Sequence, residues 1–599
     1  MHINKISIFG YTLKALYRRA RYFIYLKVTW FIYKSSLPVS STYGTYIDKF
    51  SFIESISESS LIIPKKLSSY NLKRPSKEDI EDILNNRIEI FNYCILDKDN
   101  FSRIDPITGF RWPKNKWYRD ARKDLIKGTD IKRPWEYSRL YQLITIAMEY
   151  TRTKEDRLVE YIIKEIISWN DDNPVCSAPN WSCTMEVSIR LANISIAYKL
   201  TSSSELYKNY HEKILEILNN HIGFIFNNLE NISKITSNHY CANISGLYCA
   251  LSNFPLTRKG KSIFKFSKSE LEKEIQIQTL DDGWNFELSS SYHRLVFEFF
   301  FYPIFLSADN TFSKEYYSKL YSMNQVLNDL IKPNGDLVQI GDNDSGRFII
   351  FQNFSSIGNL QASDQIKIYN QFFSYKTKEK KFLHPNADIF GYKSSNLYLI
   401  FKGGKKGQAG FGGHSHNDTF SIDLQINNKD IILDPGTGSY TASKHIRNIF
   451  RSNSRHNTVF WEGVEESNLD QGLFNLTQEN QYSIKTIYDK NKITFSGINA
   501  YKSRWHKRQV CLDIDNKLIT ISDTVSHNDA IIRFISNEII KKLSKNSFKI
   551  ADVIFEFDKS TYVIIEDGYY SPKYGCIESA NMVSLSIPNK EFKVLISLP

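Results

Sequence analysis

Three histidines and one aspartate lie close together in the C-terminal half of the sequence, and their side chains can bind a metal ion or transfer a proton. They are His414, His416, Asp434 and His456, and the whole chain contains only 12 histidines. Imidazole nitrogens and one carboxylate form a usual ligand set for zinc. The wide spacing favours neighbouring strands over a single helical turn. A lone histidine in a β domain is usually structural, so both a structural role and a metal or catalytic cluster stay open.

A second group of polar side chains lies in the N-terminal half, where helices are expected to begin. Asn238 and His239 open one such helix, and Tyr292 enters another shortly after an Asp-Gly pair. Glu186 and Arg190 lie near the start of a third. Serine, asparagine and aspartate are favoured there as caps. Capping does not explain His239, Tyr292 or Arg190, so these helix starts are also candidates for lining one shared opening.

Apolar residues recur at helical spacing from about residue 75 to 330, as in 136–150, 185–200 and 292–306. Short polar turns separate the periodic stretches. This pattern predicts an all-α array of successive helices. We place this helical domain at residues 76–375.

The pattern changes after about residue 385, where polar and apolar residues alternate and β-branched side chains become frequent. Examples are the segments 397–401, 420–426 and 517–522. Alternation of this kind indicates strands with one buried face. We therefore expect an antiparallel β-sandwich over residues 385–599, and an α+β multidomain chain as a whole.

Length and composition agree with more than one domain. A chain of 599 residues exceeds what one hydrophobic core usually organises, and its 42% hydrophobic and 24% charged residues are ordinary for a globular protein. The net charge of +12 suggests a polyanionic partner, although dispersed charge is more often a solvated surface. No nucleic-acid motif occurs, so we expect no nucleic-acid partner and keep an acidic polysaccharide open. Seven cysteines without a CxxC pair argue against a disulfide scaffold and a thiolate zinc site.

The first 75 residues form a basic, aromatic extension. Residues 1–47 contain seven lysines or arginines and no acidic residue. The uncharged runs are too short for a transmembrane helix, and no signal-peptide pattern follows. A helix of this kind could make a peripheral contact with an anionic membrane or pack on the first domain, and both alternatives stay open.

Seven short motifs follow one another along the chain. They occupy residues 181–193, 238–240, 282–293, 333–347, 413–418, 434–440 and 451–459. Each motif is weak alone, but their common order resembles the bacterial heparinase II/III polysaccharide lyases over about residues 90–525. The resemblance implies an (α/α) toroid followed by an antiparallel β-sandwich, which agrees with the periodicity.

The resemblance also implies β-elimination on a uronic-acid-containing acidic polysaccharide. Such a reaction needs a base for the C5 proton, neutralisation of the neighbouring carboxylate, and an acid for the leaving oxygen. By resemblance, Asn238 holds the carboxylate with His239 beside it. Tyr292 is the acid, and for one C5 epimer also the base, while His414 is the alternative base.

Further roles are implied in the same way. His416, Asp434 and His456 match the family's zinc ligands, a site that orders the cleft without performing the chemistry. Glu186 and Arg190 match residues that line the substrate groove. A location in the cell envelope or periplasm, and a link to capsule or another surface polysaccharide, follow as expectations. Without a signal-peptide pattern, a cytoplasmic or membrane-peripheral location stays open.

Two other functions remain as alternatives. A non-catalytic glycan-binding or polysaccharide-assembly protein could keep the fold without turnover, although it would not need Asn238, Tyr292 and His414 together. A glycoside hydrolase would need two carboxylates beside a cleft. Glu186 and Glu287 could serve, but Glu287 is as readily a capping partner.

Overall fold

The computed structural model describes residues 51–56, 74–91, 93–95, 101–231, 235–307, 312–351, 360–376, 380–557, 562–586 and 590–599, with a few isolated positions before residue 74. The basic aromatic helix expected near the N-terminus, and its membrane contact, lie outside these residues. Within them, no helix combines the length and apolar character needed to cross a bilayer.

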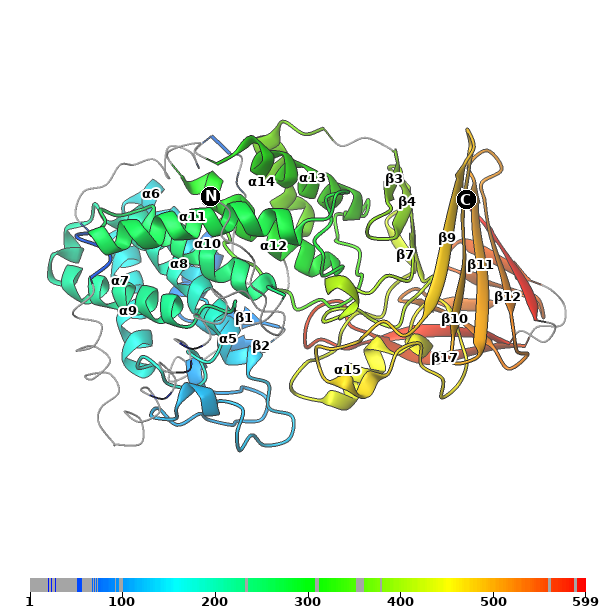
Figure 1. Cartoon of the computed structure of the whole chain (residues 1–599), viewed down its shortest axis with the longest axis horizontal. Helices are drawn as coiled ribbons and strands as arrows, with labels where there is room; N and C mark the ends of the chain where they lie inside the picture. The colour runs from blue at the N-terminus through cyan, green and yellow to red at the C-terminus, as the bar shows by residue number, and fades with distance from the viewer. Residues whose placement is uncertain are drawn as a thin grey trace. The chain divides into compact units, whose positions relative to one another are not determined.

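The N-terminal half is an array of helices, as its periodicity predicts (Figure 1). The helices are α4 (Lys77–Leu84), α5 (Lys132–Ser138), α6 (Gln142–Thr153), α7 (Asp156–Asp172), α8 (Thr184–Thr201), α9 (His211–Asn227), α10 (Asn238–Leu251), α11 (Arg258–Gln278), α12 (Ser290–Leu306), α13 (Lys314–Leu330) and α14 (Ala362–Phe373). A short antiparallel hairpin of β1 (Ile88–Ile90) and β2 (Tyr93–Ile95) follows α4.

Helix α8 lies inside this array and is buried along its whole length. Helices α6, α9 and α10 pack against it. Helix α7 is instead amphipathic, with Leu158, Ile162 and Trp169 among the residues of its buried face. A helix that is buried all round needs neighbours on every side, so the apolar residues of α8 organise the helices around it.

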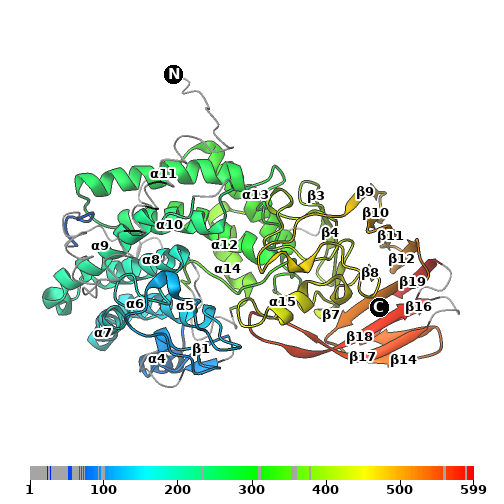
Figure 2. The same cartoon turned by 60° about the horizontal axis from the view of Figure 1, so that its bottom comes forward.

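The C-terminal half is built from antiparallel sheets (Figure 2). Their orders are β3-β4-β5-β6-β7 in a five-stranded sheet, β14-β15-β16-β19-β12-β11-β10-β9 in an eight-stranded sheet and β17-β18-β13-β8 in a four-stranded sheet. The strands are β3 (Lys380–His384), β4 (Ile389–Lys393), β5 (Leu397–Lys402), β6 (Ile422–Ile426), β7 (Lys429–Ile432), β8 (Val459–Phe460), β9 (Gln481–Tyr488), β10 (Lys492–Tyr501), β11 (Arg504–Asp513), β12 (Leu518–Val525), β13 (Ile531–Ser536), β14 (Ile540–Lys542), β15 (Ser547–Ile550), β16 (Val553–Phe557), β17 (Val563–Tyr570), β18 (Glu578–Ser586) and β19 (Glu591–Ser597).

One apolar cluster joins these three sheets. It includes Leu424 of β6, Ile521 of β12 and Phe534 of β13. Strand β12 alternates between buried and partly exposed side chains, as the alternating sequence predicts. Inward-facing apolar side chains from several sheets around one core are the packing of a β-sandwich.

The chain divides into two compact units. Unit 1 comprises Met1–Ile277, Leu295–Leu320 and Arg347–Leu360, and unit 2 comprises Gln278–Arg294, Tyr321–Gly346 and Gln361–Pro599. Three segments of the helical half therefore group with the sheets, and the third contains α14. Trp284 and Leu330, from the first and second of these segments, share an apolar cluster with Ile400 of β5.

Helix α15 (Lys444–Arg451) interrupts the C-terminal half, where almost only strands were expected. The Ser443 hydroxyl caps it by accepting a hydrogen bond from the Ile446 N–H at 3.2 Å. Its buried residues are Arg447, Phe450 and Arg451. Because two of these three are charged, hydrophobic periodicity does not reveal the helix.

Candidate active site

Tyr292 and His414 lie face to face in unit 2. Tyr292 is in the first turn of α12, and His414 is in the glycine-rich loop before β6. Their ring centroids are 3.6 Å apart and the rings are inclined by only 16°. Both side chains are buried. Two residues that the sequence marked as proton-transfer candidates are thus in direct contact.

The ring of His414 is held by Asp342. The His414 Nδ1–H donates to Asp342 Oδ2 at 2.9 Å, and the Asp342 backbone N–H donates to the His414 carbonyl at 3.0 Å. The preceding Gly341 has φ +63°, and a Cβ there would lie 2.4 Å from the His414 carbonyl oxygen. Glycine is therefore required for this approach. With Nδ1 protonated, Nε2 of His414 is the nitrogen that can accept a proton.

Asp342 is also bound by a second histidine and an arginine. His416 Nε2 lies 2.8 Å from Asp342 Oδ1, and the Arg447 guanidinium donates to both carboxylate oxygens at 2.5 and 2.7 Å. Burial alone would raise the pKa of Asp342, but Arg447 and the hydrogen bonds from His414 and His416 outweigh it and hold that pKa well below its ordinary value. Asp342 is therefore an ionised anchor for both histidines.

The hydroxyl of Tyr292 meets a second tyrosine. Tyr292 Oη lies 3.3 Å from Tyr440 Oη, and both rings are buried. Burial, followed by the carboxylates of Asp344 and Asp342, raises the pKa of Tyr292 well above its ordinary value. Tyr292 therefore keeps its proton at neutral pH and can act as an acid.

His416, Asp434 and His456 form a second cluster in unit 2. One possible ligand atom from each lies within 4.8 Å of those of the other two, and all three residues are buried. His456 Nδ1 lies 3.1 Å from Asp434 Oδ2. Among the described residues, His416 Nδ1 and His456 Nε2 are buried without a hydrogen-bond partner. A buried nitrogen without a partner costs about 1–3 kcal/mol, and a bound metal ion would remove that cost.

The donor set fits zinc. Tetrahedral zinc holds nitrogen and oxygen ligands about 2.0–2.2 Å away, so the ligands lie roughly 3.3 Å apart. Burial lowers the pKa of His416 despite its bond to Asp342, which favours the neutral ring that binds metals. The Asp342 carboxylate lies on the far nitrogen of His416, where it would fix the orientation of the ring toward a bound ion.

Asn238 and His239 are the first two residues of α10 and belong to unit 1. Asn238 is buried, and His239 Nδ1 lies 2.9 Å from Glu230 Oε1. Tyr292 and His414 belong to unit 2. The expectation that these residues face one cleft with Asn238 therefore stays a prediction.

Glu186 and Arg190 lie on α8 inside the helical array. The Arg139 guanidinium donates to both carboxylate oxygens of Glu186, at 2.7 and 2.8 Å. Arg190 lies over the Trp169 ring at 4.0 Å and donates to His221 Nε2 at 3.0 Å. Both side chains are buried. These ion-pair, hydrogen-bond and ring partners favour a structural role, and the expected groove contact stays a prediction.

Three residues of the site in unit 2 were not assigned from the sequence. Asp342 and Tyr440 stand inside motifs that were recognised, but neither received a role. Arg447 lies in α15, which the sequence did not predict. The signal for Asp342 was its position in the Ile-Gly-Asp run beside a required glycine, since such a glycine marks a close backbone approach.

Two family models match most of the chain. The model "Heparinase II/III N-terminus" matches residues 77–368, and "Heparinase II/III-like, C-terminal" matches residues 376–593. The chain is thus of the polysaccharide-lyase class. It belongs to the heparinase II/III-like family.

Individual relatives are distant. A heparin-sulfate lyase of Bacteroides thetaiotaomicron is 19% identical over 528 residues, which are 78% of this chain and 72% of that protein. A heparin-sulfate lyase of Bacteroides stercoris is 22% identical over 455 residues, covering 69% of this chain and 61% of that protein. The solved structure of a heparinase III matches with a TM-score of 0.64 at 14% identity, covering 96% of this chain and 91% of that one. The fold is therefore the expected one, an (α/α) toroid followed by an antiparallel β-sandwich.

Proposed function

We propose that this lyase cleaves a uronic-acid-containing acidic polysaccharide by β-elimination. The observation that carries the proposal is the stacked pair of Tyr292 and His414, an acid and a base in direct contact. Asp342 orients the base, and Tyr440 meets the hydroxyl of the acid. A protein that only binds glycans has no need for a proton donor and a proton acceptor held in this way.

Each proton has a place in the reaction. His414 Nε2 accepts the C5 proton, and the C5–H electron pair forms a double bond between C4 and C5. The C4–O4 bond breaks as this double bond forms, and Tyr292 gives its proton to the leaving O4. For the opposite C5 epimer, the proton lies on the other face of the sugar. Tyr292 would serve as the base there only after losing its own proton, which its raised pKa opposes, and it would then pass the C5 proton to O4.

The uronate carboxylate must also be neutralised, because the charge that develops at C5 spreads onto it. We assign this role to Asn238, whose amide can donate a hydrogen bond, with His239 beside it. Both residues stand in the first turn of α10 in unit 1.

We further propose that His416, Asp434 and His456 hold a zinc ion with a structural role. Zinc supplies a fixed cross-link among its ligands and takes no part in the proton transfers. The ligands would tie the loop that carries His414 to the segment before β8. That link would hold the His414 ring in place against the Tyr292 ring.

A glycoside hydrolase is less compatible with the carboxylates present. Glu186 is buried in an ion pair with Arg139, and the buried Glu287 accepts a hydrogen bond from Gln408 at 3.2 Å. Glu287 Oε2 also lies 3.6 Å from His414 Nε2, so both carboxylates already face partners within the protein. The paired tyrosine and histidine explain an elimination more directly than a hydrolysis.

The experiment is a screen of acidic polysaccharides, including glycosaminoglycans, alginates and bacterial capsules. We expect one class to yield a product with an unsaturated uronic acid, seen by its ultraviolet absorbance. New reducing ends without that absorbance would indicate a hydrolase. Tight binding without either product would indicate a glycan-binding protein. We propose capsule or another surface polysaccharide as the natural substrate, and the cell envelope as the place of action.

A further inference from the structure

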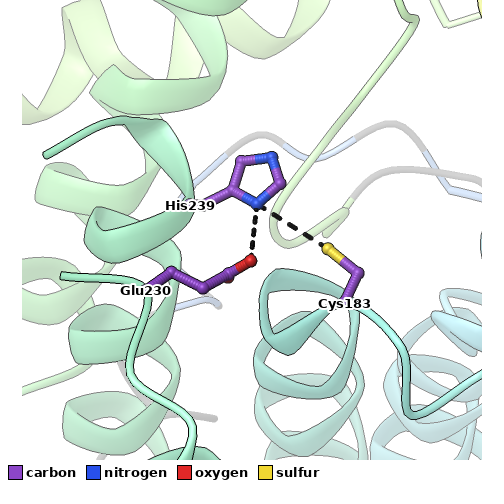
Figure 3. A group of neighbouring side chains, drawn as sticks. All are labelled: Cys183, Glu230 and His239. Carbon is purple, nitrogen blue, oxygen red and sulfur yellow. Dashed lines mark hydrogen bonds and ion pairs between the residues drawn. The ribbon is translucent and has the colours of Figure 1, made fainter. Parts of the chain in front are cut away.

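A second cluster of metal-binding side chain types lies in unit 1. Cys183 precedes α8, Glu230 follows α9 and His239 is the second residue of α10. Figure 3 shows His239 Nδ1 facing both partners, with Glu230 Oε1 at 2.9 Å and Cys183 Sγ at 3.7 Å. One possible ligand atom from each residue lies within 4.8 Å of the other two. Segments far apart in the sequence thus bring sulfur, nitrogen and oxygen donors to one place.

The carboxylate of Glu230 is oriented by neighbours that do not belong to the cluster. Its Oε2 accepts hydrogen bonds from the Met185 backbone N–H at 3.1 Å and from Asn243 Nδ2 at 3.2 Å. The Glu230 backbone N–H donates to Asn243 Oδ1 at 2.8 Å. These bonds leave Oε1 facing His239. Such outer contacts are typical of carboxylates that bind metals.

The cluster is accessible from one side. Cys183 is only 6% exposed, whereas the His239 side chain is 39% exposed and that of Glu230 is 28% exposed. An ion can therefore enter beside the imidazole and the carboxylate and meet the sulfur behind them. With three protein ligands, a tetrahedral ion keeps a fourth position for water or another oxygen ligand.

We propose that Cys183, Glu230 and His239 bind a divalent metal ion that accepts sulfur, with Zn²⁺ the best match. Zinc–ligand distances of about 2.3 Å for sulfur and 2.0–2.1 Å for nitrogen place these two donors roughly 3.6 Å apart. The 3.7 Å between Cys183 Sγ and His239 Nδ1 fits this value. The carboxylate must retreat by a few tenths of an ångström from its hydrogen-bonding distance. A thiolate ligand disfavours Mg²⁺ and Ca²⁺, which prefer oxygen.

This site is separate from His416, Asp434 and His456, which contain no sulfur. Binding at Cys183 releases the thiol proton and forms a metal–sulfur bond. The thiolate and carboxylate together balance the charge of the ion. His239 would bind the ion through Nδ1, and its Nε2 would remain available for the role proposed beside Asn238.

Cobalt(II) distinguishes the two sites, because a thiolate bound to cobalt gives a strong near-ultraviolet charge-transfer band. We expect the full-length chain loaded with Co²⁺ to show this band and Cys183→Ser to lack it. Asp434→Asn should keep the band, since it changes only the sulfur-free cluster. Cys511→Ser is the matched control and should also keep it. Zinc content after equilibrium dialysis should be lower by one ion per chain in Cys183→Ser.

Glu230→Gln gives a second variant that preserves side-chain shape. We expect its zinc affinity to fall by about 10-fold or more, with an unchanged thermal midpoint of the metal-free chain. A Co²⁺-loaded wild-type chain without the sulfur band, or equal zinc content in wild type and Cys183→Ser, would overturn the proposal. None of these measurements uses a polysaccharide, so their failure is distinguishable from failure of the lyase assignment.

Discussion

The Asp342 carboxylate accepts hydrogen bonds from His414, His416 and Arg447 at the same time. It thus connects the proposed base to a proposed zinc ligand. A carboxylate that orients a histidine fixes which ring nitrogen carries the proton. The same anion therefore affects both the catalytic and the metal-binding residues of unit 2.

Asp342→Asn should weaken both zinc binding and lyase activity while leaving the shape of the side chain unchanged. We expect zinc affinity to fall by about 10–100-fold, as for other losses of a carboxylate behind a metal-bound histidine. Lyase activity should fall with it, because His414 loses its fixed orientation. Competition with a chromogenic chelator measures the first effect. Asp336→Asn, at an exposed position of the same segment, is the control, and equal zinc affinity in both variants would contradict the role given to Asp342.

At the scale of single residues, the sequence shows which side chains could bind a metal or transfer a proton, but it does not show which of them contact one another. His416, Asp434 and His456 could be named because their types suit zinc and they lie near each other in the sequence. Cys183 lies inside the motif at 181–193 but received no role, and Glu230 lies in none of the motifs, since the contact of both with His239 depends on the packing of α8, α9 and α10. Asp342 and Arg447 are 105 positions apart in sequence, and only the fold brings them together.

The helices and strands themselves were largely predictable, because most of them bury an apolar face. Helix α15 was not, since its buried face contains Arg447 and Arg451. Arg447 donates hydrogen bonds to the Asp342 carboxylate. Arg451 donates hydrogen bonds to the backbone carbonyls of Leu469 and Gly472. A charged residue can be buried where such partners exist, and the partners cannot be read from local periodicity.

Strands β11 and β12 contain a comparable buried ion pair. Asp523 accepts hydrogen bonds from Arg508 at 2.8 and 3.0 Å and lies 2.6 Å from His506 Nε2. Burial alone would raise the pKa of Asp523, but Arg508 and His506 outweigh it and lower that pKa to about 2. Asp523→Asn leaves the buried Arg508 without its charged partner, which costs about 3–5 kcal/mol. We expect the thermal midpoint of unfolding to fall by roughly 6 °C or more.

The pH dependence of this effect has a definite sign. The folded-state pKa of Asp523 is lowered, so its stabilisation is complete above about pH 5 and is lost as the pH falls towards 2. The difference in thermal midpoint between wild type and Asp523→Asn should therefore shrink over that range. Asp529→Asn removes an exposed pair with Arg504 and should change the midpoint little. A difference that stays constant down to pH 2 would contradict the ionised pair.

On the scale of the whole molecule, the residues given roles in the chemistry are distributed over the two compact units. Asn238 and His239 come from the helical unit, whereas Tyr292 and His414 come from the unit that contains the sheets. The segment with Tyr292 was expected to belong to the helical domain, but it packs with the sheets through Trp284. The stacked pair thereby forms within one unit.

Tyr292→Phe tests the proposed acid most directly, because it removes one hydroxyl and keeps the ring stacked on His414. Tyr398→Phe is the matched control, since it removes another buried hydroxyl of unit 2, which donates to the Asp329 carbonyl at 3.1 Å. The measurement is the rate at which each purified variant forms unsaturated product from the polysaccharide that wild type cleaves. We expect Tyr292→Phe to bind this polysaccharide normally but to react at least ~10²-fold more slowly, with Tyr398→Phe close to wild type. Near-normal turnover by Tyr292→Phe would contradict the assignment of Tyr292 as the acid.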